Sequence, residues 1–203
     1  MTTITFLKTG LLGIIFSAIT AYSALALPAN MTTDGATNPP VGHYEFCRRL
    51  PQECRANPLG GSAPVTLTRE GWKKILEVNY DVNETITPMT DMEIYGVEEY
   101  WAYPDKAGDC EDFVLLKRKR LMEAGFSPSD LLITVVLQPN GEGHAVLTVR
   151  TDRGDFILDN MRNKVLLWSE TEYTYLKRQS IENAGRWVKL QDGRTVAVGS
   201  VSQ

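Results

Sequence analysis

Apolar positions spaced by polar ones at helical intervals predict a first helix, which begins after Thr68 and ends near Asn83. Its apolar residues are Trp72, Ile75, Leu76 and Val78. A threonine just before such a pattern is a common N-cap, because its hydroxyl accepts a hydrogen bond from a free N–H of the first turn. The segment that follows contains Pro88 and Gly96 and is therefore predicted to be a loop.

A second helical pattern runs from Glu111 to about Ala124 and is followed by Gly125, a common helix stop. The apolar residues along one side of this helix are Phe113, Leu116 and Leu121. The basic run Lys117-Arg118-Lys119-Arg120 spreads around the helix and predicts a solvated outer face. One basic run in a chain with a formal net charge of −4 argues against a nucleic-acid partner.

From residue 131 onward the pattern changes to short apolar runs and alternation, which predict β-strands. The three clearest strands are Leu131–Leu137, Ala145–Arg150 and Asp155–Leu158. Weaker signals predict a short strand at 165–168, a helix at 171–181 and two closing strands at 187–190 and 195–198. Helices followed by strands with short turns predict an α+β fold, in which N-terminal helices pack on a largely antiparallel sheet.

The turn Thr151-Asp152-Arg153-Gly154 joins two of these strands into a hairpin and limits which residues can face one another. A turn centred on residues 151–152 places His144 directly opposite Asp159. A turn centred on residues 152–153 places Asp159 opposite Val146 and diagonal to His144. Both registers put the two side chains on one face of the sheet, because side chains alternate with period two. Directly opposed residues have Cβ atoms about 5 Å apart, so the carboxylate can hold one imidazole nitrogen.

The beginning of the chain predicts export. Lys8 is the only charge before an apolar run from Leu11 to about Ala21, and Ala24-Leu25-Ala26 then forms a small-residue cleavage site. The alternative is a membrane anchor, but the run is shorter than the roughly 20 residues that span a bilayer. We therefore predict a signal peptide at 1–26, an irregular N-terminal arm at 27–66 and one domain at 67–203.

Three cysteines in an exported chain leave one unpaired. Cys47 and Cys54 are close in sequence, and an oxidising compartment favours a disulfide between them. Cys110 then remains as a free thiol, which is a liability in such a compartment unless it is buried or used. Metal binding by the three cysteines is disfavoured, because no Cys-x-x-Cys pair and no second local histidine support it.

Cys110 lies between Asp109 and Glu111, where an extended stretch gives way to the second predicted helix. Together with His144 and Asp159 it supplies the nucleophile, the base and the orienting group of thiol-based acyl transfer. The N-terminus of a helix favours a thiolate, and its free N–H groups can bind an oxyanion. The neighbouring carboxylates oppose ionisation of the thiol, so a bound cation would help. Because carboxylates facing a loop are suitable Ca²⁺ ligands, we predict a calcium role for Asp109 and Glu111.

Each of these residues also has a structural interpretation. A lone cysteine is more often a small apolar core residue than a nucleophile, and acids at the start of a helix are favoured by its dipole. Transfer of an acyl group to an amine needs the same three side chains as hydrolysis, so transglutaminase chemistry stays open. A calcium-dependent binding module with a relic triad is the third alternative.

Several segments in a consistent order resemble one known family. These segments are Val78-Asn79, Val82-Asn83, Glu99-Tyr100-Trp101-Ala102-Tyr103-Pro104, Gly108–Phe113, Gly143–Leu147 and Leu158-Asp159-Asn160. They resemble the bacterial transglutaminase-like cysteine peptidases, which include the periplasmic LapG-type proteases. The resemblance covers about residues 72–185 and leaves the arm with Cys47 and Cys54 outside the shared core.

The resemblance implies a papain-like transglutaminase core in which Cys110 is the nucleophile, His144 the general base and then acid, and Asp159 the orienting group. It also implies Ca²⁺ bound by Asp109 and Glu111. The expected substrate is a protein, namely a large cell-surface adhesin cleaved near its N-terminus at an Ala-Ala pair, which would control biofilm release. An inner-membrane receptor that responds to cyclic di-GMP is the expected regulatory partner, and the periplasm is the expected location.

Overall fold

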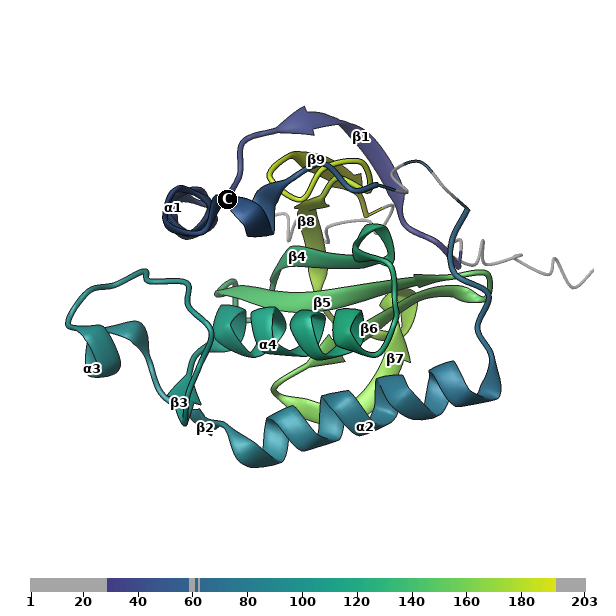
Figure 1. Ribbon diagram of the computed structural model, residues 1–203. Coiled ribbons are helices and arrows are strands. Elements are labelled where there is room, and N and C mark those ends of the chain that lie inside the picture. The colour runs from purple at the N-terminus through teal and green to yellow at the C-terminus, as the bar shows by residue number, and fades with distance from the viewer. Residues whose placement is uncertain (1–28, 59–60, 62, 193–203) are drawn as a thin grey trace, which may run out of the picture.

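The computed structural model describes residues 29–58, 61 and 63–192 and shows one antiparallel sheet with helices on one face (Figure 1). The strands follow the order β1-β9-β8-β4-β5-β6-β7. Their bounds are β1 Thr32–Thr37, β4 Leu131–Leu137, β5 Gly143–Thr151, β6 Gly154–Asp159, β7 Arg162–Leu167, β8 Thr174–Gln179 and β9 Trp187–Gln191. A separate parallel pair, β2 (Thr87–Pro88) and β3 (Ala107–Gly108), precedes the long central helix. Among the described residues, no helix combines the length and the apolar character that a membrane crossing requires.

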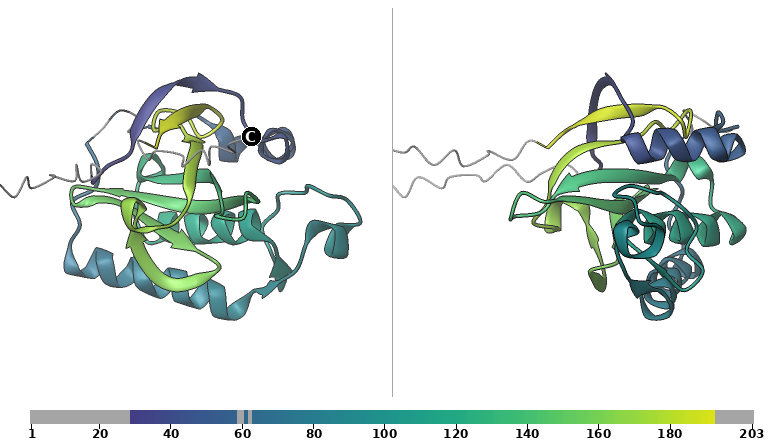
Figure 2. Two further views of the ribbon diagram at one scale, coloured as in Figure 1. Left: turned by 180° about the vertical axis from the view of Figure 1, so that it is seen from behind. Right: turned by 90° about the vertical axis from the view of Figure 1, so that its left-hand side faces the viewer.

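Four α-helices and three 3₁₀ helices complete the described fold. The α-helices are α1 Val41–Arg49, α2 Arg69–Thr85, α3 Asp91–Tyr95 and α4 Cys110–Glu123, and the 3₁₀ helices are η1 Pro51–Cys54, η2 Pro128–Asp130 and η3 Trp168–Glu170. α4 packs across β4, β5 and β6, and α2 lies beside α4 and β7. The view from behind shows no helix covering the middle of the opposite face (Figure 2). A smaller apolar cluster that includes Val146, Ile157 and Trp168 lies on that face.

The two predicted helices are present because their local signals are strong. Thr68 is the N-cap of α2, and its hydroxyl accepts a hydrogen bond from the N–H of Gly71 at 3.0 Å. α4 ends at Glu123 with Ala124 as its C-cap, and Gly125 follows with a φ of 95°, a left-handed conformation that disfavours residues with a side chain. The loop predicted after α2 contains the short strand β2 and the short helix α3, which a capping box between Thr90 and Glu93 starts.

The basic run on α4 forms the predicted solvated face only in part, because Lys119 is exposed whereas Lys117 and Arg118 are not. The side chain of Lys117 is fully buried, and Arg118 is 4% exposed. The Nε of Arg118 donates to the carbonyl of Leu131 at 3.0 Å and so ties α4 to β4. The prediction was wrong for Lys117 and Arg118, because α4 is covered by the sheet on one side and by α2 on another.

The hairpin adopts the second of the two predicted registers. Leu147 pairs with Leu158 and Thr151 with Gly154, so the turn is centred on Asp152 and Arg153. The predicted helix at 171–181 is wrong, because this segment contains β8, which pairs with β4 and β9. The predicted strand at 195–198 lies outside the described residues.

The arm predicted to be irregular contains regular structure. β1 forms an edge strand of the sheet through its pairing with β9, and α1 and η1 follow it. The predicted disulfide between Cys47 and Cys54 is present and joins α1 to η1.

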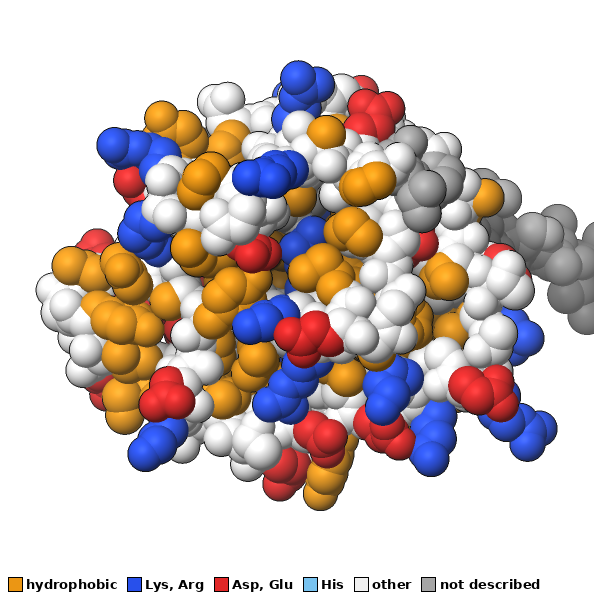
Figure 3. Space-filling model, in the orientation of Figure 1, with side chains coloured by type: hydrophobic (Ala, Val, Ile, Leu, Met, Phe, Trp, Pro, Cys, Tyr) orange, Lys and Arg blue, Asp and Glu red, His pale blue; other side chains and the backbone are white. Residues whose placement is uncertain are grey.

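Figure 3 shows a group of exposed hydrophobic side chains over α3. Its exposed members in and beside α3 are Met89, Met92, Tyr95 and Val97.

Candidate active site and acidic cluster

A cavity of about 360 Å³ brings together the start of α4 and the start of β5. Its lining includes Cys110, the first residue of α4, and His144, the second residue of β5. Trp101 forms another part of the wall. A larger cavity of about 430 Å³ at the start of α2 is lined by none of the predicted site residues. The two predicted reactive side chains therefore meet in one cavity although 34 positions separate them in the sequence.

His144 and Asp159 form the predicted pair. The Nε2 atom of His144 lies 2.9 Å from a carboxylate oxygen of Asp159, and both side chains are buried. Because an ionised carboxylate can only accept, a neutral imidazole in this pair carries its proton on Nε2 and keeps a lone pair on Nδ1. The pair therefore fixes the tautomer that a general base requires.

Asp159 receives further hydrogen bonds that hold it ionised. Tyr173 donates its hydroxyl at 2.6 Å, the Nε of Arg162 donates at 3.2 Å and the N–H of Met161 donates at 3.0 Å. Burial by itself raises the pKa of this carboxyl, but the hydrogen bonds from His144 and Tyr173 outweigh it and lower the pKa to about 2. Asp159 is therefore an anion at neutral pH despite its burial.

Helix α2 supports the segment that carries Asp159. Asn83 donates its side-chain amide to the carbonyl of Asp159 at 2.9 Å and to that of Arg162 at 3.2 Å. One turn earlier, Asn79 donates to the carbonyls of Arg162 and Asn163 at 3.2 and 3.1 Å. The two asparagines are thus positioned by helical spacing to satisfy the turn between β6 and β7.

The surroundings of Cys110 favour the protonated thiol. Its Sγ donates to a carboxylate oxygen of Glu111 at 3.1 Å. Burial raises the pKa of the thiol well above its usual value, and the charge and hydrogen bond of Glu111 raise it further. A thiolate at this position therefore needs a positive charge nearby.

An acidic cluster lies beside the thiol. One carboxylate oxygen from each of Asp91, Asp109 and Glu111 lies within 4.8 Å of the others. Burial and the charge of Asp109 raise the pKa of Glu111 to about 8, and burial also raises the pKa of Asp109. One buried oxygen of Asp91 and one of Asp109 have no hydrogen-bond partner in the described part of the chain. Unpaired carboxylate oxygens that converge and repel one another fit a divalent cation.

The structure brings together the five predicted site residues and adds Asp91 to them. The five are Cys110, His144, Asp159, Asp109 and Glu111. Asp91 was not predicted, because 18 positions and a loop separate it from Asp109 and no local spacing relates the two. Tyr173 was also missed, since the wrongly predicted helix at 171–181 would have oriented it differently. The one sequence signal near Asp91 is the capping box at Thr90 and Glu93, which marks a helix start rather than a ligand.

Comparisons with known proteins identify the family of this chain and a shared fold. A family model described as bacterial transglutaminase-like cysteine proteinase matches residues 33–195. Among solved structures, Legionella pneumophila LapG is 28% identical over 58% of this chain and 68% of its own, with a TM-score of 0.49. Calcium-bound L. pneumophila LapG is 23% identical over 71% of this chain and 87% of its own, with a TM-score of 0.50, and shows the shared fold. No curated protein matches.

Proposed function

This chain belongs to the bacterial transglutaminase-like cysteine proteinases, and we propose that it is a periplasmic endopeptidase whose triad is Cys110, His144 and Asp159. The observation that carries this proposal is the 2.9 Å contact of His144 with Asp159 beside the free cysteine of the described chain. That contact leaves Nδ1 of the imidazole available to accept the thiol proton in a shared cavity.

The proposed reaction proceeds in two steps. The Nδ1 of His144 takes the proton of Cys110, and the sulfur attacks the carbonyl carbon of a peptide bond. The resulting oxyanion accepts hydrogen bonds from free backbone N–H groups at the start of α4. The imidazolium then gives its proton to the leaving amine, and a thioester remains. Water, deprotonated by His144, attacks the thioester and releases the acid and the thiol.

Ca²⁺ is the cation that we propose for the acidic cluster, held by Asp91, Asp109 and Glu111. Hard oxygen ligands and carboxylates with unpaired oxygens suit this ion. When bound, it supplies positive charge next to the thiol and offsets the field of the carboxylates. One of the similar L. pneumophila LapG structures is calcium-bound.

The proposed substrate is a cell-surface adhesin, and the proposed regulator is an inner-membrane receptor. Both follow from the resemblance of the segments around Cys110 and His144 to the LapG-type proteases. The apolar segment at 1–26, which lies outside the described residues, supports delivery to the compartment where such partners are found.

The test compares the purified protein with the Cys110→Ala variant. We expect the wild type to cleave an alanine-rich fluorogenic peptide and to be labelled by iodoacetamide at Cys110, as read by peptide mass spectrometry. The variant should lose cleavage, because the sulfur is the nucleophile, and should keep its melting temperature within a few degrees, because one small residue replaces another. Cleavage by the variant would remove the triad assignment. Transfer of the acyl group to an added amine instead of water would favour the transglutaminase alternative.

A further inference from the structure

One wall of the active-site cavity is a segment without helix or strand. Residues 99–104 have no regular secondary structure, yet Glu99 and Trp101 line the cavity and the indole of Trp101 is 2% exposed. Such a segment keeps one conformation only where side chains from elsewhere satisfy its backbone groups. The contacts that hold it therefore decide the shape of the cleft in which a peptide would bind.

Two backbone N–H groups of this segment donate hydrogen bonds to carboxylates in or next to the acidic cluster. The N–H of Tyr100 donates to the carboxylate of Asp91, and the N–H of Ala102 donates to Asp112 at 2.8 Å. A backbone carbonyl of the same segment accepts a hydrogen bond from α1. Arg49 donates a guanidinium N–H to the carbonyl of Trp101, and its guanidinium carbon lies 4.0 Å from the centre of the Tyr100 ring.

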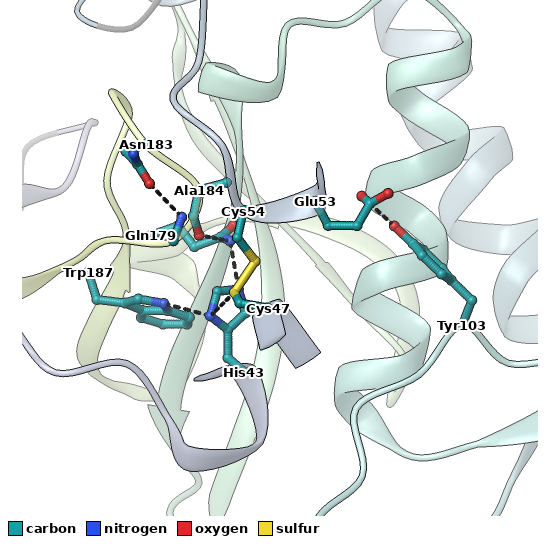
Figure 4. The surroundings of a disulfide bond; sticks show 10 residues. His43, Cys47, Glu53, Cys54, Tyr103, Gln179, Asn183, Ala184 and Trp187 are labelled. Atoms are coloured by element: carbon teal, nitrogen blue, oxygen red, sulfur yellow. Dashed lines mark hydrogen bonds between the residues drawn. A yellow bond between two sulfur atoms is a disulfide. The ribbon is translucent and has the colours of Figure 1, made fainter. Parts of the chain in front are cut away.

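Other residues on the same side of α1 and on η1 contact the segment along its length. A Cβ added at Gly42 would lie 2.3 Å from the indole of Trp101, so only glycine allows this close approach. Phe46 packs edge-on against Tyr103 with ring centroids 5.9 Å apart. Glu53 of η1 accepts the hydroxyl of Tyr103 at 2.8 Å (Figure 4). Gly42, Phe46 and Arg49 are spaced four and three residues apart, which places them on one face of the helix.

Two further links hold α1 in place. Alone, a helix of 9 residues is too short to be stable in water. The disulfide between Cys47 and Cys54 closes the chain between α1 and η1. His43 is buried between Trp187 and Gln179, which contact its ring nitrogens at 3.2 and 3.1 Å (Figure 4). The disulfide arm, here residues 39–54, is thus fixed to the sheet at one side and to the cleft wall at the other.

We propose that Arg49 is a positioning residue for peptide binding, which fixes the cleft wall through the Trp101 carbonyl and the Tyr100 ring. The disulfide arm keeps Arg49 at this place. The inference rests on the proposed peptidase function, because it assigns the cleft to a peptide. Arg49 does not line the cavity, so it acts through Trp101 rather than on the substrate.

The test measures alkylation of Cys110 with two reagents on the full-length mature protein. Iodoacetamide reacts with the thiol without occupying the cleft, whereas an N-capped Ala-Ala chloromethyl ketone must bind in the cleft first. In each reaction the sulfur forms a thioether and the halide leaves. We expect Arg49→Met to raise the half-saturating concentration of the chloromethyl ketone about tenfold. In this variant the cleft wall is not fixed beforehand, so binding must order one or two of its side chains, and that costs free energy. The limiting rate should change less than about twofold, as for a group that acts on binding alone.

Two comparisons separate a positioning role from a general structural one. Arg48→Met is the matched control, because the exposed guanidinium of Arg48 pairs with Glu45 of its own helix. It should behave as the wild type with both reagents. Arg49→Lys should fall between the wild type and Arg49→Met, because an ammonium can donate to the Trp101 carbonyl but lacks the planar face that covers Tyr100. The iodoacetamide rate should be the same in all four proteins.

If Arg49→Met has the same half-saturating concentration of the chloromethyl ketone as Arg48→Met, the inference is overturned and the proposed function stands. A wild type that shows no saturation with the chloromethyl ketone would instead contradict the proposed function. If Arg49→Met fails to fold, Tyr100→Leu removes the ring under the guanidinium and should raise the same half-saturating concentration. An unchanged value in that variant would also overturn the inference.

Discussion

Asp159 shows how one side chain joins the chemistry of the site to the stability of the fold. It is buried, yet it receives hydrogen bonds from His144, Tyr173 and Arg162. A buried carboxylate without donors would be protonated, and a protonated acid would hold the imidazole less well. The same hydrogen bonds that orient His144 therefore also make Asp159 a stabilising anion.

We predict that the stabilising effect of Asp159 depends on pH. Its pKa in the folded protein is lowered to about 2, below the value in an unfolded chain. A group with a lowered pKa contributes stability above its unfolded pKa, and this contribution is lost as the pH falls toward the folded pKa. Asp159→Asn should therefore be less stable than the wild type by about 2 kcal/mol at pH 6, with a smaller difference at pH 3.

Urea unfolding at several pH values measures this difference. Asp34→Asn is the control, because Asp34 is exposed on the edge strand β1. A difference between wild type and Asp159→Asn that stays constant from pH 6 to pH 3 would contradict the prediction. It would mean that the substitution acts through packing and not through the charge.

The three side chains of the proposed triad lie at or near the ends of helices and strands. Cys110 is the first residue of α4, His144 is near the start of β5, and Asp159 is the last residue of β6. Side chains at the ends of packed elements can converge in a cavity without disturbing the core between them. α3 adds Asp91, its first residue, whose carboxylate lies close to those of Asp109 and Glu111.

Chelation should show whether this junction of α3 and α4 binds calcium. We expect EGTA to lower both peptide cleavage and the melting temperature. Ca²⁺ at a hundred times its Kd stabilises a protein by about 2.7 kcal/mol. For a domain of this size that corresponds to a melting shift on the order of 5–10 °C. Asp91→Asn should abolish most of the shift, since it removes one of three carboxylates.

Differential scanning calorimetry with calcium and with EGTA provides the measurement. Asp81→Asn, an exposed position on α2, is the control and should keep the full shift. Melting curves of the wild type that coincide in calcium and in EGTA would remove the calcium proposal and leave the triad untouched.

The molecule as a whole is held by contacts between distant parts of the chain. β1 pairs with β9 at one edge of the sheet, so residues near 32 and near 191 lie side by side. The disulfide arm then crosses to the cleft wall, and α2 and α4 cover the face of the sheet beneath it. In this arrangement the start of α4 lines the cavity.

We predict that the whole protein is processed on export. The small residues Ala24 and Ala26 precede the expected cleavage point, because a signal peptidase accepts only small side chains there. The mature protein expressed in a Gram-negative bacterium should begin at Leu27 and appear in the periplasmic fraction. N-terminal sequencing checks this, and Ala26→Arg should block it. A cytoplasmic protein that retains Met1 would contradict the prediction.

Local patterns accounted for the features that neighbouring residues determine. The N-cap at Thr68, the helix that begins near Cys110 and the hairpin that puts His144 and Asp159 on one face all depend on spacing and turn chemistry within a few residues. The periodicity of a strand also fixed the shared face of His144 and Asp159 in either register.

Other features depended on packing between elements that are far apart in the sequence. The residues of a short segment do not show which distant elements will contact it. Residues 174–179 form a strand because β4 and β9 flank them, and Lys117 is buried because α4 is covered by the sheet and α2. Asp91 joins the acidic cluster, and Arg49 reaches Trp101, only through long-range packing. Such contacts gain their free energy from tertiary burial and pairing, which can override the propensity of a short segment.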